Sequence, residues 1–170
     1  MTKGSGFSIF MMSTGDVYER YKQIINQLSD KYEAPKFEPH VTLISRLELS
    51  ENELLSKISE LADILRPFEI NLTTAEYLDE YFRCVFILAE KTNIIMKANM
   101  EARKIFGRLH DPPYMPHLSL LYGDFDEKTK KKIIEELGDV SGSFEVNSIF
   151  LFSTEGEVKD WYKVKEFPLH

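Results

Sequence analysis

The sequence predicts an α+β domain that folds into two similar lobes with a cleft between them. The first observation is a repeated motif, because Pro39–Leu43 and Pro116–Leu120 both read proline, histidine, apolar residue, hydroxyl residue, leucine. The second is the order of apolar periodicities, which predicts β-α-β-α-β-β followed by α-β-α-β-β, with the motifs in equivalent strands. Third, no linker or low-complexity stretch interrupts the 170 residues. We therefore predict one domain over residues 1–170, whose lobes are the repeated halves at roughly 1–90 and 91–170.

The first half begins with a short apolar strand, and two amphipathic helices follow along the chain. The first helix carries apolar residues at the 3.6-residue period, and the second begins with a capping box in which Ser50 precedes Glu53. Pro67 ends the second helix, because proline cannot continue it. Two strands joined by a turn complete the half. The predicted elements of this half lie at residues 7–12, 16–32, 40–45, 50–66, 68–77 and 82–89.

The second half lacks an opening strand and otherwise repeats the first. Thr92 caps a helix that ends at Gly107, where glycine favours the left-handed conformation of a helix end. A proline-rich loop then leads into the second motif strand. A helix over 127–137 follows, and two strands at 144–153 and 160–167 close the chain.

Composition describes an acidic globular chain with a single thiol. The formal net charge is −7, which argues against an extended DNA or RNA partner, since that would need a basic surface. The longest apolar runs, such as Phe7–Met12, are too short to span a bilayer, and Met1–Gly6 lacks the apolar core of a signal peptide. Cys84 is the only cysteine, so no internal disulfide can form and a reducing, cytoplasmic compartment is favoured. We expect a monomer that binds a small molecule and no membrane.

The two motifs supply matched pairs of side chains. Because side chains alternate across a strand, His40 shares a face with Thr42, and His117 shares a face with Ser119. If both strands face the cleft, two imidazoles and two hydroxyls converge there. Histidine exchanges protons near neutral pH, so this set predicts acid–base catalysis on a phosphate ester.

Other interpretations of these residues have less support. The motif histidines lack histidine, cysteine or carboxylate partners at the spacing of zinc ligands, so we predict neither a metal nor another cofactor. Ser119 lacks the sequence context of a nucleophilic serine. His110 lies in the proline-rich loop and His170 is the last residue, so neither is a preferred site residue.

The motifs Pro-His-Val-Thr-Leu and Pro-His-Leu-Ser-Leu-Leu-Tyr-Gly together resemble the signature of the two-histidine (2H) phosphoesterase superfamily. The similarity covers essentially the whole chain and is greatest to the cyclic phosphodiesterase branch, similar to plant and fungal enzymes acting on ADP-ribose 1″,2″-cyclic phosphate. It implies a bilobal, pseudo-two-fold, LigT-like fold in which two antiparallel sheets line a central cleft and the helices lie outside. It also implies a place in RNA or tRNA splicing metabolism.

The resemblance assigns roles to the four motif side chains. His40 and His117 become the acid–base pair, with His117 favoured as the base and His40 as the acid. The near-symmetry of the site leaves the reverse assignment open. Thr42 and Ser119 become hydrogen-bond donors to phosphoryl oxygens.

Two aromatic residues enter by the same resemblance. Tyr122 matches an aromatic residue that the cyclic phosphodiesterases use near the ligand. Plain strand alternation, however, points Tyr122 away from the face of His117, unless Gly123 bends the strand. Phe10 stands where those enzymes place a tryptophan against the ligand, so the stacking contact differs here.

These observations predict metal-independent hydrolysis of a small cyclic phosphate. The resemblance suggests two substrates: ADP-ribose 1″,2″-cyclic phosphate, giving ADP-ribose 1″-phosphate, and nucleoside 2′,3′-cyclic phosphates, giving 2′-phosphates. A 2′,5′-RNA ligase-like or RNA-end-processing phosphodiesterase is one alternative, although a longer RNA would need a basic track on the surface. A non-catalytic module that binds nucleotides or RNA ends is the alternative from another class.

Overall fold

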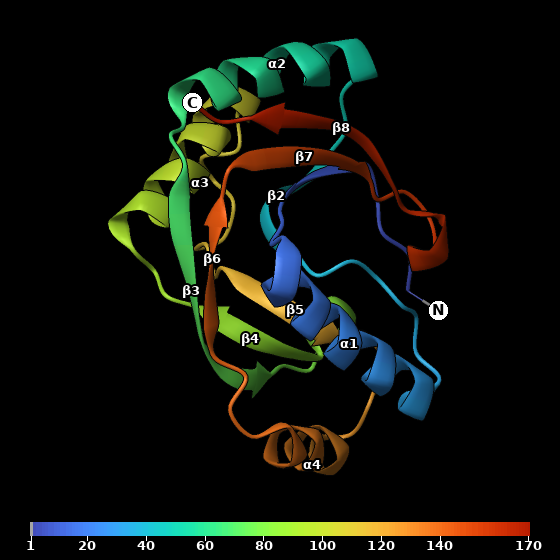
Figure 1. Ribbon diagram of the computed structural model, residues 1–170. Coiled ribbons are helices and arrows are strands. Elements are labelled where there is room, and N and C mark those ends of the chain that lie inside the picture. Colours follow the sequence, from blue (N-terminus) through green and yellow to red (C-terminus); the bar gives the residue numbers. More distant parts are fainter. Residues whose placement is uncertain (1) are drawn as a thin grey trace.

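The computed structural model describes residues 2–170, and its chain alternates between strands and helices (Figure 1). In chain order the elements are β1 (Phe7–Met11), α1 (Gly15–Tyr32), β2 (Val41–Leu47), α2 (Glu51–Ile64), β3 (Phe68–Tyr77), η1 (Tyr81–Arg83), β4 (Val85–Ala89), α3 (Asn93–Phe106), β5 (His117–Leu121), α4 (Glu127–Leu137), β6 (Gly142–Val146), β7 (Ser148–Ser153), η2 (Val158–Asp160) and β8 (Tyr162–Pro168).

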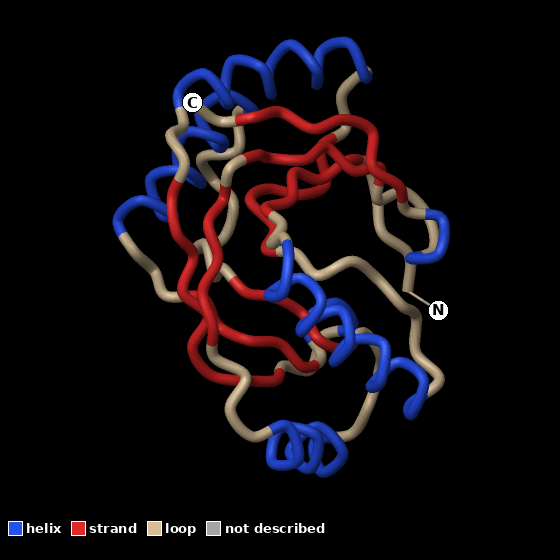
Figure 2. The backbone as a smooth tube through the Cα atoms, in the orientation of Figure 1, coloured by secondary structure: helices blue, strands red, loops and turns tan. Residues whose placement is uncertain are grey.

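All eight strands belong to one curled antiparallel sheet, whose order is β6-β3-β4-β5-β2-β1-β7-β8. The helices lie around the outside of this sheet (Figure 2). The predicted α+β class and bilobal architecture are confirmed, but the two expected sheets are continuous. They join between β2 and β5, where a single residue pair, Val41 with Leu118, is in register. This narrow seam lies at the middle of the strand order.

The predicted strand over 144–153 is wrong, because the chain breaks at Asn147 into two strands. β6 pairs with β3 at one edge of the sheet, whereas β7 pairs with β1 and β8 near the other. The sequence carries a sign of the break, since the buried residues change parity there. Phe144 and Val146 are buried before the break, and Ile149 and Leu151 after it, so one unbroken strand would place them on opposite faces.

Strand pairing shows where the structural repeat begins. β4 pairs with β5 as β1 pairs with β2, so β4 supplies the opening strand that the second half was expected to lack. By this pairing the repeated units are β1-α1-β2-α2 and β4-α3-β5-α4. The strands that follow each unit cross over in the sheet, because β3, which follows the first unit, lies beside β4, whereas β7 and β8, which follow the second unit, lie on the β1 side.

The helices also cross between the units. Helix α1 packs against β5, and α3 packs against β2, so each motif strand is covered by the helix of the other unit. The α3 side chain of Asn99 donates a hydrogen bond of 2.8 Å to the Leu43 carbonyl oxygen of β2. Behind the motif face, Leu43 of β2 and Leu120 of β5 are buried in the core.

Helix ends follow the predicted signals. The Ser50–Glu53 capping box is present, Thr92 accepts a hydrogen bond from the Ile95 N–H, and Gly107 ends α3 with a left-handed φ of 68°. The strand predicted at 82–89 is β4, which begins only at Val85, because the preceding residues form the short 3₁₀ turn η1. Over residues 2–170, every helix falls short of the length and apolar character that a bilayer crossing requires.

Candidate active site

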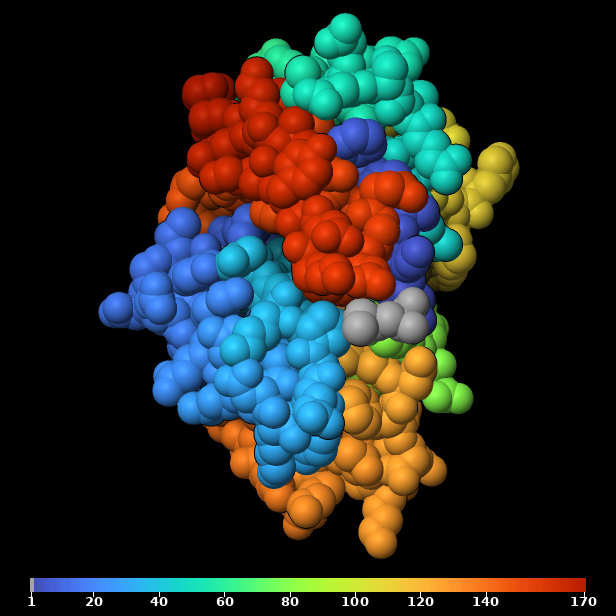
Figure 3. Space-filling view, turned by 90° about the vertical axis from the view of Figure 1, so that its right-hand side faces the viewer, coloured from blue at the N-terminus to red at the C-terminus, as the bar shows by residue number. Residues whose placement is uncertain are grey.

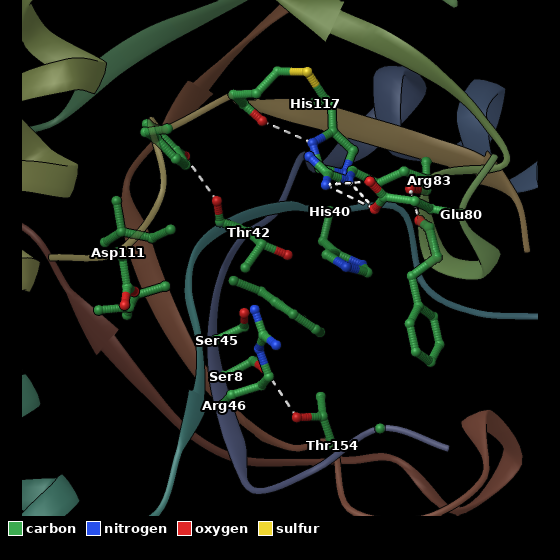
Figure 4. Close-up of a pocket in the computed structure, with 18 of the residues that line it drawn as sticks. Ser8, His40, Thr42, Ser45, Arg46, Glu80, Arg83, Asp111, His117 and Thr154 are labelled. Atoms are coloured by element: carbon green, nitrogen blue, oxygen red, sulfur yellow. Dashed lines mark hydrogen bonds and ion pairs between the residues drawn. The ribbon is translucent and has the colours of Figure 1, made fainter. Parts of the chain in front are cut away.

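The two motif histidines meet at the seam of the sheet. Val41 and Leu118 form the one registered pair between β2 and β5, and both are fully buried on the side of the helices. His40 and His117 each precede a member of this pair, so alternation turns both imidazoles to the opposite face. There they line one cavity of about 560 Å³ (Figure 4). The structure therefore brings the two predicted histidines together.

The two predicted hydroxyl residues lie in the same cavity wall. Extending the antiparallel register by one residue on each side of the seam places His40 opposite Ser119 and Thr42 opposite His117. Ser119 is buried, and its Oγ donates a hydrogen bond of 2.9 Å to the Phe82 carbonyl oxygen. That donor must rotate before it can reach a ligand.

Both imidazoles are held by the same backbone arrangement. The Nδ1 of His40 lies 2.6 Å from the Glu38 carbonyl oxygen, and the Nδ1 of His117 lies 2.8 Å from the Met115 carbonyl oxygen. A carbonyl only accepts, so each Nδ1 carries the hydrogen and each neutral ring keeps its Nε2 lone pair. The intervening proline restricts the residue before it to extended conformations, which orients both carbonyls.

Burial sets the protonation of the two rings. It lowers the pKa of His40 from 6.5 to about 4, and the hydrogen bond to Glu38 opposes this only in part. Burial also lowers the pKa of His117, against the effect of its bond to Met115. Charge on His117 further lowers the pKa of His40, because the two rings are neighbours. Both imidazoles are therefore neutral at neutral pH when no anion is bound beside them.

Phe10 lies in the cavity wall and contacts His40 directly. The two rings stack with centroids 3.6 Å apart and planes 16° apart. Phe152 packs behind Phe10 at 4.8 Å between centroids. Phe10 thus fixes the plane of the His40 ring, a contact that the sequence did not indicate.

Tyr122 also lies in the cavity wall, against the expectation from plain strand alternation. Phe86 of β4 pairs with Ser119, whereas the preceding Val85 pairs with Leu121, so β5 carries one extra residue here. Such a bulge reverses the alternation beyond it. Leu121 consequently packs on the helix side, and Tyr122 turns toward the cavity. The bulge causes this reversal within β5, before the chain reaches Gly123.

Three further aromatic residues lie around this wall. Phe37 stacks on Tyr122 with centroids 3.8 Å apart. The Tyr114 hydroxyl donates a hydrogen bond of 2.7 Å to the Thr42 carbonyl oxygen, which ties the loop before β5 to β2. Trp161 lines both the main cavity and a smaller one of about 160 Å³ beside it. All three therefore contribute to the shape of the site.

The N-terminal segment closes one side of the cavity near Trp161. Gly4 exchanges two backbone hydrogen bonds with Gly156, of 2.8 and 3.2 Å, and Figure 3 shows the orange-red segment around residue 156 beside the dark blue N-terminal residues. A Cβ at Gly4 would lie 2.9 Å from the Trp161 ring and would overlap the Thr154 carbonyl oxygen. This position therefore requires glycine for close approach.

Sequence reasoning missed the charged lining of the cavity. Four cations and two carboxylates contribute to its wall: Lys3, Arg46, Arg83, Arg103, Glu80 and Asp111. Glu80 forms an ion pair with Arg83, and Asp111 forms one with Arg108, which is not part of the wall. The wall therefore has an excess of positive charge, although the whole chain has a net charge of −7. These residues come from five separate segments, and only the Glu80–Arg83 spacing is a local signal. His110 is exposed and lies outside the wall.

A curled antiparallel sheet that presents a histidine and a hydroxyl from each of two repeated units defines a two-histidine phosphoesterase. The model of the family described as "Cyclic phosphodiesterase-like protein" matches residues 6–169. The chain belongs to that family, and it is accordingly a phosphodiesterase hydrolase.

Individual relatives agree with this assignment. A cyclic phosphodiesterase of Arabidopsis thaliana is 28% identical over 158 residues, covering 90% of this chain and 87% of the relative. Among solved structures, E. coli LigT complexed with 3′-AMP has a TM-score of 0.62 at 15% identity, covering 98% of this chain and 99% of LigT. A Thermus thermophilus protein has a TM-score of 0.66 at 17% identity, covering 96% and 97%. The two structures show the LigT-like fold.

Proposed function

We propose that the protein hydrolyses a small cyclic phosphate without a metal ion, with His40 and His117 as the acid–base pair. The observation that carries the proposal is the matched pair of imidazoles at the seam. Each Nδ1 is bound to the carbonyl two residues before it, at 2.6 and 2.8 Å, so both Nε2 atoms are left for chemistry in one cavity.

The reaction is an in-line attack of water on a strained ring phosphorus. His117 removes a proton from the water through its Nε2, and His40 gives a proton to the departing sugar oxygen. Thr42 and Ser119 donate hydrogen bonds to the non-bridging oxygens, for which Ser119 rotates away from the Phe82 carbonyl. Each positioned proton transfer contributes on the order of 10²–10⁴-fold.

Both histidines are neutral before a substrate binds, so His117 can already act as the base, whereas His40 must gain a proton to act as the acid. The negative charge of a bound phosphate raises the pKa of a neighbouring imidazole. The Phe10 ring stacked on His40 at 3.6 Å also favours the charged form of that imidazole. A phosphate would act on both rings, so it is the Phe10 stack that supports His40 as the acid and His117 as the base, the assignment that the family resemblance favours.

The size and charge of the cavity support a small nucleotide substrate. Its volume of about 560 Å³ lies in the range of small-molecule sites, and its excess of cations suits an anion. LigT, which shares the fold, has been crystallised with 3′-AMP, NADP⁺ and ATP. ADP-ribose 1″,2″-cyclic phosphate and nucleoside 2′,3′-cyclic phosphates are therefore the substrates to test.

The test is incubation with both kinds of cyclic phosphate and with a short RNA, followed by product analysis with and without EDTA. We expect the cyclic phosphates to be opened in EDTA, and His40→Asn and His117→Asn each to lower kcat by on the order of 10²–10⁴-fold. His110→Asn, at an exposed position outside the cavity wall, is the matched control. A strict requirement for a divalent metal, cleavage of the RNA alone, or binding without turnover would each contradict the proposal.

A further inference from the structure

An arginine–glutamate pair lies beside His117 in the cavity wall (Figure 4). The Arg83 Nε and Nη2 donate to the two carboxylate oxygens of Glu80, each at 2.7 Å. The side chains are 35% and 49% exposed, so solvent and ligand can reach them. Two of the three guanidinium nitrogens donate hydrogen bonds to the carboxylate, and the third, Nη1, can donate one to an oxygen atom of a ligand.

The turn that carries Arg83 is fixed to the strand of His117. Within the turn, the Arg83 N–H donates to the Glu80 carbonyl at 3.2 Å. The Gly123 N–H, just beyond β5, donates to the Tyr81 carbonyl at 3.0 Å. Ser119 of β5 donates to the Phe82 carbonyl at 2.9 Å. The guanidinium is therefore held in a defined place relative to the histidine.

Hydrolysis of a cyclic phosphate creates negative charge that the motif residues do not balance. The substrate phosphodiester carries one negative charge, and the monoester product carries about −1.5 to −2 at pH 7. The two imidazoles together carry one positive charge through the reaction, on His40 before it and on His117 after it, and the hydroxyl donors bring no net charge. The product side of the reaction therefore needs a cation near the histidines.

The two other arginines of the wall are less suited to this task. Arg103 is buried and donates to the Asp111 and Pro112 carbonyls at 3.0 and 2.6 Å. Arg46 lies on the far side of the cavity from the Glu80–Arg83 pair in Figure 4. Arg83 is the cavity cation whose charge acts on His117.

We propose that Arg83, held in orientation by Glu80, binds the phosphoryl oxygens of the substrate and product beside His117. This inference rests on the proposed function and adds a substrate-binding residue outside the two motifs. The two hydrogen bonds to Glu80 hold the plane of the Arg83 guanidinium in one orientation.

The same pair has opposed effects on His117. The Arg83 charge lowers the pKa of His117, and the Glu80 charge raises it. The remaining groups that face this ring are the neighbouring His40, the Met115 carbonyl oxygen and the uncharged Phe86 ring at 5.2 Å. Removing one member of the pair at a time should therefore move the titration of His117 in opposite directions.

The experiment compares Arg83→Gln, Glu80→Gln and the control Arg66→Gln, which is exposed and outside the cavity wall. We would measure hydrolysis of a nucleoside 2′,3′-cyclic phosphate, binding of inorganic phosphate, and the NMR titration of His117. Arg83→Gln should lower kcat/KM and phosphate affinity about 10- to 100-fold, as loss of a charged hydrogen bond does, and should raise the pKa of His117. Glu80→Gln should lower that pKa.

The inference would be overturned if Arg83→Gln kept the wild-type affinity for phosphate. It would also be overturned if Arg83→Gln and Glu80→Gln shifted the pKa of His117 in the same direction. These two readouts do not need turnover. If the wild-type protein opened no cyclic phosphate, the proposed function would fail, while phosphate binding and the titration would still decide the role of Arg83. Arg66→Gln should match the wild type in all three measurements, and an equal effect there would show that loss of any arginine suffices and so refute the inference.

Discussion

The burial of His40 makes the stability of the fold depend on pH. Its pKa is about 4 in the folded protein against an ordinary 6.5, so the unfolded chain binds a proton at a pH where the native ring stays neutral. Stabilisation from the neutral ring is complete above pH 6.5 and is lost as the pH falls toward 4. A difference of 2.5 pKa units corresponds to ~3 kcal/mol. His40 is only 6% exposed, so solvent screens little of this effect.

Denaturant unfolding at a series of pH values between 7 and 4 measures this loss. His40→Asn retains a donor that can reach the Glu38 carbonyl, while it removes the titrating ring and the stack on Phe10. The variant should be less stable at neutral pH, and its stability should fall with pH by ~3 kcal/mol less than that of the wild type. His110→Asn, at an exposed position, should keep the wild-type slope. Identical slopes in His40→Asn and the wild type would refute the reasoning.

Three other features give sharp expectations. Gly4→Ala should destabilise the protein by about 1–3 kcal/mol, because the added methyl group would meet the Trp161 ring and the Thr154 carbonyl oxygen. Acrylamide quenching of the fluorescence of Trp161, the only tryptophan, should increase. Unchanged quenching would contradict the packing described. Cys84 is fully buried, which raises its pKa to about 11, so a thiol reagent at pH 8 should react only after denaturant is added. Ser50→Ala removes the capping box of α2 and should cost about 0.5–2 kcal/mol in denaturant unfolding; equal stability would show that α2 needs no cap.

The motifs and helix ends were accessible from the sequence because each is a local pattern. Ser50 and Glu53 define a helix start within four residues, and the strand alternation around His40 follows directly from its neighbours. Other features depend on contacts between distant segments. The bulge that turns Tyr122 to the cavity is a property of the β4–β5 register, and the sequence of β5 by itself does not indicate it.

The charged wall of the cavity was hidden for the same reason. Arg46 and Arg83 come from different strands and turns, and they become neighbours of one cavity only when the sheet curls. The break at Asn147 was different, because the change in parity between Val146 and Ile149 could have been read in advance. Residues 144–153 are mostly apolar, so the stretch as a whole predicts one continuous strand.

The crossed helices have a consequence for how the chain reaches its native state. While the ribosome synthesises the first repeated unit, the apolar face of α1 has no partner, because the strand it covers, β5, begins only at His117. The helix that covers β2, α3, is likewise made later. Contacts across so many residues slow folding and leave apolar surface exposed meanwhile. A fragment that ends near residue 90 would therefore contain His40 on a strand whose covering helix, α3, is absent, and it would lack His117.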